Sequence, residues 1–114
     1  MKKINILVYG KHPEILDTVL RLINNNEAWS GEGYTEEEVI IEQFWQRSYD
    51  ILLLGGGIDE TSEKKVRALF QQARPESAIV QHFGGGSGLL KSEIEGVLAA
   101  REQANIQITD NPFS

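Results

Sequence analysis

Ile51-Leu52-Leu53-Leu54 followed by Gly55-Gly56-Gly57 is the stretch that decides the fold of this chain. Four consecutive apolar residues are typical of a central strand in a parallel sheet, because both faces of such a strand are covered. A second apolar run, 78–83, leads into Gly84-Gly85-Gly86. The carboxyl ends of parallel strands form the edge at which open α/β sheets bind ligands. The sequence therefore places bare glycine at the edge where function is expected.

Outward from this strand, apolar runs of strand length alternate with segments of helical period, which predicts repeated β-α-β units. We expect strands at 4–9, 28–34, 50–54, 78–83 and 106–109, and helices at about 13–23, 36–45, 62–73 and 88–103. Gly31 and Gly33 weaken the second strand, which is therefore expected to be a short or irregular edge strand. The stretch Thr35-Glu36-Glu37-Glu38 predicts a capping box at the start of the second helix.

The two tryptophans are expected in different environments. Trp45 follows the apolar residues of the second predicted helix, and a side chain on that face is expected in the core or at its margin. Trp29 lies beside the weak second strand, and it is expected at the surface.

Composition indicates one globular domain, residues 1–114, and limits its partners. The chain carries 17 acidic and 11 basic residues, a net charge of −6, which disfavours nucleic acids and anionic membrane surfaces. It contains no cysteine, which excludes disulfides and thiolate chemistry. The first apolar run, 4–9, is too short for a signal peptide or a membrane span, so a cytoplasmic location is expected.

Three stretches match one known family: 6–16, which contains Pro13-Glu14-Ile15-Leu16, then 49–54, and finally Asn111-Pro112-Phe113. On these residues the chain resembles a response-regulator receiver domain, a CheY-like member of the flavodoxin-like class, over nearly its full length. The resemblance implies a three-layer α/β/α domain with five parallel strands in the order 2-1-3-4-5. Only five residues follow the fifth predicted strand, so the family's last helix is expected to be missing.

The resemblance also assigns the family's phosphorylation site to residues that lack its chemistry. The positions of the acid pair, the acceptor aspartate, the switch hydroxyl and the conserved lysine are held here by Gly10, Lys11, Gly55, His82 and Asn111. Magnesium prefers anionic oxygen ligands, and a phosphoaspartate cannot form on glycine. Asp59 could serve as the acceptor only if the alignment were shifted by four residues, from Gly55 into the loop after the strand.

The glycine-rich segment after the fourth predicted strand is the best signal for a bound ligand. Its residues are Gly84, Gly85, Gly86, Ser87 and Gly88. Consecutive backbone N–H groups at the start of a helix can hold an anion. The spacing differs from both the Rossmann fingerprint and the phosphate loop. The alternative function is therefore binding of an anion or small molecule at the glycine-rich ends of the third and fourth strands.

His12 and His82 are the only histidines, and the predicted topology brings both to the same edge. A shared metal site would need further ligands, so we favour a helix-capping or solvent-exposed His12 and a half-buried His82, with no metal. The position of His12 after the first strand partly resembles cobalamin-binding domains. Gly10 and Ile15 depart from that pattern, so no cofactor is expected.

These observations favour a pseudo-receiver, a signalling or scaffolding module that contacts another protein and is not phosphorylated. No nucleophile with an orienting base and acid is evident, so the chain is expected not to be an enzyme. A missing last helix would leave Ile106 or Ile108 and Phe113 uncovered. A second copy of the chain is the simplest cover, and a homodimer is therefore expected.

Overall fold

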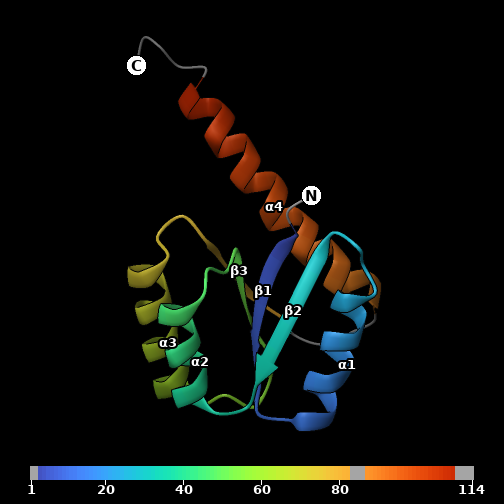
Figure 1. The fold of residues 1–114 in the computed structure, drawn as a ribbon, viewed down its shortest axis with the longest axis vertical. Coiled ribbons are helices and arrows are strands. Elements are labelled where there is room, and N and C mark those ends of the chain that lie inside the picture. Colours follow the sequence, from blue (N-terminus) through green and yellow to red (C-terminus); the bar gives the residue numbers. More distant parts are fainter. Residues whose placement is uncertain (1–2, 83–86, 110–114) are drawn as a thin grey trace.

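In the part of the chain that the structure describes, four strands alternate with four helices, as in an α/β protein. A computed structural model describes the backbone of residues 3–82 and 87–109. Side chains are described for residues 3–82 and 88–101. The elements are β1 (Ile4–Tyr9), α1 (Pro13–Asn24), β2 (Trp29–Tyr34), α2 (Glu37–Gln46), β3 (Ile51–Leu54), α3 (Glu60–Ala73), β4 (Ala78–Gln81) and α4 (Ser87–Thr109). The strands form one parallel sheet in the order β2-β1-β3-β4. Helices cover both of its faces (Figure 1).

The central strands form as the apolar runs predict. Every residue of β3 is buried, and β3 pairs in register with β1 from Ile6 opposite Ile51 onward. The helix after β1 begins at Pro13, where a missing N–H costs nothing, and ends at Asn24. The amide side chain of Asn24 both donates to and accepts from the backbone of Gly31, at 3.2 and 2.9 Å, which fastens the end of α1 to β2.

The strand β2 is regular, and the expectation of a short or irregular strand is wrong. All six of its residues pair with β1. Its glycines are required by packing: a Cβ at Gly31 would lie 2.8 Å from Cγ2 of Ile23, and one at Gly33 would lie 2.6 Å from Cδ1 of Leu16. The two glycines therefore let α1 lie close against the sheet.

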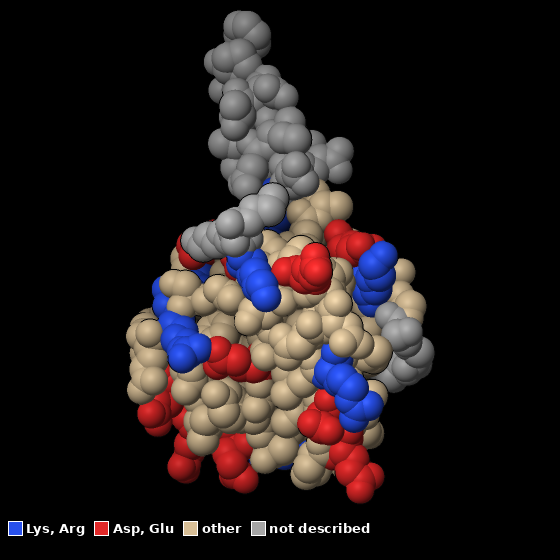
Figure 2. Space-filling model, turned by 45° about the vertical axis from the view of Figure 1, so that its right-hand side comes forward, with Lys and Arg blue, Asp and Glu red and all other residues tan. Residues whose placement is uncertain are grey.

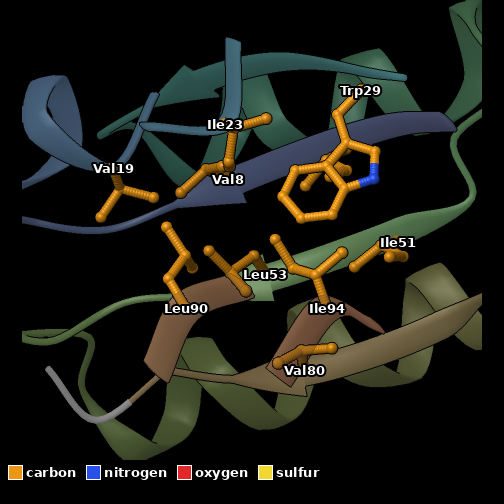
Figure 3. Packing of buried hydrophobic residues seen from close by; sticks show 10 residues of the cluster. Val8, Val19, Ile23, Trp29, Ile51, Leu53, Val80, Leu90 and Ile94 are labelled. Atoms are coloured by element: carbon orange, nitrogen blue, oxygen red, sulfur yellow. The ribbon is translucent and has the colours of Figure 1, made fainter. Parts of the chain in front are cut away.

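Two hydrophobic cores lie on opposite faces of the sheet. On one face α1 and α4 pack on the sheet through Val19, Ile23, Leu90 and Ile94 (Figure 3). On the other face α2 and α3 pack through Ile40, Phe44, Val66 and Phe70. Phe44 and Phe70 meet edge to face with their ring centroids 5.1 Å apart.

The predicted fifth strand is wrong, because residues Ile106–Thr109 belong to α4. A four-residue alternation is a weak strand signal, and no glycine or proline between 97 and 109 ends the helix before it. The side chain of Arg101 anchors α4 near the start of β3, where its Nη1 donates to the carbonyl oxygen of Asp50 at 3.2 Å. Beyond this residue α4 projects past the sheet (Figure 1).

The expectation of an uncovered sheet face is also wrong. Leu90 and Ile94 of α4 are 2% and 0% exposed, and they pack beside α1 on the face that a missing last helix would have left open. The homodimer was expected because a missing last helix would leave this face uncovered, and that reason no longer holds. Phe113 lies outside the described residues, and self-association itself stays a prediction.

Two local expectations on α2 and the tryptophans fail as well. The residue that precedes α2 is Glu36, and its side chain makes no capping hydrogen bond, so the predicted capping box does not form. Trp29 is 6% exposed and Trp45 is 60% exposed, the reverse of the expected environments.

Candidate functional site

At the carboxyl edge of the sheet, two glycines lie opposite each other at the ends of β1 and β3. The amide of Gly55 donates to the carbonyl oxygen of Tyr9 at 2.7 Å. A Cβ built on Gly55 would lie 3.5 Å from Cα of Gly10, which is ordinary van der Waals contact. Gly10 and Gly55 therefore bring two backbones together and leave the space above them free of their own side chains.

A pocket of about 260 Å³ lies at this edge. Its walls are mainly apolar and come from β1, α1 and β3, including Val8, Val19 and Leu53, which gather around Leu90 in Figure 3. Gly10 and Gly55 also line it, as do His12 and His82. Both histidines therefore line one pocket, at the sheet edge where the sequence predicted them to lie.

His82 is buried and paired with an acid that sequence reasoning missed. It is 7% exposed, less than the predicted half-burial, and its Nδ1 lies 2.6 Å from Oε1 of Glu93 on α4. Its backbone amide also continues the sheet by donating to the carbonyl oxygen of Leu54 at 2.9 Å. His82 and Glu93 are 11 positions apart, one before α4 and one within it, so no periodic signal in the sequence links the two.

The other candidate residues at this edge have separate structural roles. His12 is exposed and precedes α1 without a capping hydrogen bond from its side chain. Lys11 donates from Nζ to the carbonyl oxygen of Thr35 at 3.0 Å, on the side of α2. Asp59 caps α3, because its Oδ1 accepts from the amide of Ser62 at 2.8 Å. Within residues 3–82 and 87–101, no three His, Asp or Glu side chains lie close enough to hold a metal ion.

Most of the predicted anion loop lies outside the described residues. Gly84, Gly85 and Gly86 lie outside the described residues, as does Asn111. The backbone of Ser87 begins α4, and Gly88 follows it in an exposed position. No part of the described structure therefore tests the anion loop as a whole.

The carboxyl edge is acidic. The first turns of α1, α2 and α3 all begin at this edge and carry Glu14, Glu37, Glu38, Glu60 and Glu63. Figure 2 shows acidic side chains gathered at the lower end of the molecule, where these helices start in Figure 1. Three of these five carboxylates are paired with a cation, Glu37 with Lys65, Glu60 with Lys64 and Glu63 with Arg67, so the edge carries charges of both signs.

A chain of polar side chains runs from β1 to the surface on the α2 and α3 side. The hydroxyl of Tyr9 lies 2.8 Å from Oγ of Ser62, which donates to Oε1 of Glu37 at 2.6 Å. Lys65 donates to the other carboxylate oxygen at 2.9 Å. The hydrogen bond from Ser62 and then that from Lys65 lower the pKa of Glu37 below its usual range. The network joins α2 to α3 and satisfies the buried Tyr9 hydroxyl.

Replacing Glu37 with Gln should weaken the acid sensitivity of folding. A carboxyl whose folded pKa lies below its unfolded value binds more protons when unfolded, so its stabilisation is present at neutral pH and is lost as the pH falls through the folded pKa. We expect Glu37→Gln to cost about 1 kcal/mol at pH 7, because the side chain is partly exposed, and to flatten the fall in stability below about pH 4.5. Urea unfolding between neutral and acid pH measures both effects.

Glu38→Gln is the matched control, because Glu38 is exposed in the same turn of α2. That variant should follow the pH profile of the unaltered protein. A Glu37→Gln profile that is parallel to the unaltered one across the acid range would contradict the assignment.

None of the described helices is both long and apolar enough to cross a membrane.

Comparison with known proteins identifies the fold. No protein-family model matches the chain, and no curated protein matches it either. A signal receiver domain of an HD domain-containing protein from Pseudomonas fluorescens matches all of this chain and 96% of its own, with a TM-score of 0.65 and 13% identity. A protein from Burkholderia pseudomallei, named as related to pilus assembly, matches 76% of this chain and 68% of its own, with a TM-score of 0.55 and 21% identity.

A third solved structure, the pilus assembly protein CpaE of Burkholderia thailandensis by its name, is 18% identical and matches 78% of this chain and 76% of its own, with a TM-score of 0.57. At these identities the matches bear on the fold. The parallel sheet, its order β2-β1-β3-β4 and the helices on both faces agree with the receiver domain that is matched over the whole chain. This chain has a receiver-like α/β fold.

Proposed function

We propose that this chain is a receiver-like module that signals or scaffolds through contact with a protein partner, without phosphorylation at the receiver's acceptor position. The observation that carries the proposal is Gly55 at the end of β3, facing Gly10 at the end of β1. In the receiver alignment these positions belong to the acceptor and to an acid that binds magnesium. Glycine supplies neither a nucleophile nor a metal ligand. The role assigned here is non-enzymatic.

The nearest alternative acceptor is already used in the fold. Asp59 caps α3 through the amide of Ser62, and Ser62 in turn joins Tyr9 and Glu37. Phosphorylating Asp59 would disturb that cap and add charge beside the acidic first turns of α2 and α3. This arrangement supports a module that does not use Asp59 as a phosphoacceptor.

The full chain should gain no phosphoryl group from a small-molecule donor. We expect intact-mass spectrometry to show an unchanged mass after incubation with acetyl phosphate and Mg²⁺, and beryllofluoride to leave the amide NMR spectrum unchanged. A receiver domain that retains its acceptor aspartate is treated in parallel as the positive control. Stoichiometric incorporation at any aspartate would contradict the proposal, and Asp59→Asn would then show whether Asp59 is the acceptor.

Self-association belongs to the same proposal. Among the described elements β2 pairs only with β1 and β4 pairs only with β3, so the sheet has two outer edges at which a second copy of the chain could extend it. The anion-binding alternative is not adopted, because Gly84, Gly85 and Gly86 lie outside the described residues and no observation on the described residues favours it.

A further inference from the structure

The pocket at the carboxyl edge is large enough for a small organic molecule. Its volume is about 260 Å³. An apolar cavity of about 150 Å³ is enough to hold a benzene ring. The pocket therefore has room for one substituted ring or a compact pair of fused rings.

The walls of the pocket are built from rigid parts of the fold. Val8, Val19 and Leu53 are 2%, 6% and 0% exposed, and they belong to the core on the α1 face. Ile15, at 54% exposure, stands at the first turn of α1 and also lines the pocket. A mostly apolar, preformed concave site with few polar groups is the usual form of a small-molecule site.

Two buried or partly buried polar side chains line the pocket, and their hydrogen bonds differ. Gln81 is engaged at both ends of its amide, accepting from Arg67 at 3.2 Å and donating to the carbonyl oxygen of Leu54 at 3.3 Å. His82 uses Nδ1 toward Glu93. In the tautomer whose proton lies on Nδ1, facing the Glu93 carboxylate, Nε2 accepts a hydrogen bond. A ligand hydroxyl or N–H group is its natural complement.

Charge around the pocket selects against acids. The carboxylate of Glu93 lies against His82, with Oε1 2.6 Å from Nδ1 of the ring. A carboxylate or phosphate bound beside His82 would contact the same side chain as the Glu93 carboxylate, which repels it. The surroundings favour a neutral molecule.

We infer that this pocket binds a small neutral ring compound, phenolic or indolic in type, whose hydroxyl or N–H donates to Nε2 of His82. The site occupies the edge at which the receiver alignment places the phosphorylation residues, so binding of such a ligand is a means of input to this module. The inference goes beyond the proposed function and does not depend on it. The two proposals can fail separately. Phosphorylation of the chain would contradict the proposed function alone, and absence of binding by both phenol and indole would contradict this inference alone.

The test is a titration of the ¹⁵N-labelled full chain with phenol, indole, toluene and benzoate, followed by amide NMR. Phenol and indole should bind saturably, with the largest shifts at the amides of Gly10, Gly55 and His82. Toluene lacks the donor and should bind about threefold to tenfold more weakly than phenol, the range expected for one hydrogen bond. Benzoate should bind more weakly than either donor ligand.

Gly55→Val is the variant that fills the pocket. A Cβ at Gly55 meets only Cα of Gly10 and the carbonyl oxygen of Tyr9, both at 3.5 Å, so the fold should accommodate it. We expect the affinity for phenol to fall by about tenfold or more. Gly96→Ala in α4, where a Cβ would meet nothing within 4 Å, is the matched control and should bind phenol unchanged.

Three outcomes would overturn the inference. They are the absence of saturable binding by both phenol and indole, unchanged phenol affinity in a folded Gly55→Val variant, and tighter binding of benzoate than of phenol. The amide spectrum of Gly55→Val reports its folding. If it is unfolded, Ile15→Ala, which removes an exposed part of the pocket wall, replaces it, and unchanged phenol affinity in that variant then counts against the site.

Discussion

Replacing Ile94 with Ala should lower the free energy of unfolding by about 2–5 kcal/mol, a large share of the roughly 5–15 kcal/mol that a domain of this size has in total. Ile94 is 0% exposed and belongs to the core on the α1 face. In Figure 3 it points from α4 toward the sheet, near Trp29, Ile51 and Val80. Removing its side chain would leave a cavity between α4 and the sheet that rigid strands cannot close.

Leu89→Ala on the same helix is the matched control. Leu89 is 46% exposed, so its truncation should change stability by about 0.5 kcal/mol or less. Urea unfolding followed by circular dichroism gives the midpoint urea concentration of each variant, and an unchanged dependence of the free energy of unfolding on urea makes the midpoints comparable. Equal, small effects of the two variants would mean that α4 does not cover this face, and the earlier expectation of an uncovered sheet would regain its basis.

The parts of the fold that could be predicted are those specified by neighbouring residues. The apolar run of β3 and the proline at the start of α1 are local signals, and each element lies where its signal predicts. The end of the chain lacked such a signal. Residues 106–109 alternate like a strand, but the helix that begins at Ser87 continues through them, and its anchor to the sheet, Arg101 with Asp50, joins residues 51 positions apart.

The candidate site divides in the same way. The glycines at the strand ends could be read from the sequence because Gly55 directly follows β3 and Gly10 directly follows β1. The pairing of His82 with Glu93 could not, since it depends on where α4 packs after a connection whose path the residue pattern does not specify. The pocket could not be read from the sequence either, because its walls come from β1, α1, β3 and β4, which only the folded sheet brings together.

The two tryptophans show how packing reverses a local reading. On β2, Trp29 lies on the same side of the strand as Gly31 and Gly33, the side that faces α1. The two glycines let α1 lie close to the strand, and the indole of Trp29 packs near the carboxyl end of α1. On α2 the buried face is defined by Ile40 and Phe44, four residues apart, and Trp45 is turned about 100° away from Phe44. The apolar residues of α2 thus include one, Trp45, whose side chain faces solvent.

Trp29→Ala should therefore destabilise the protein by about 3–5 kcal/mol, whereas Trp45→Ala should change stability by about 0.5 kcal/mol or less. The exposed fractions, 6% and 60%, set this contrast. Each variant keeps one tryptophan, so its fluorescence reports on that residue alone: the buried Trp29 should emit at shorter wavelength than Trp45 and shift to longer wavelength on unfolding. A larger loss of stability in Trp45→Ala would show that α2 packs through the face predicted from the sequence, and it would contradict the arrangement of both helix layers.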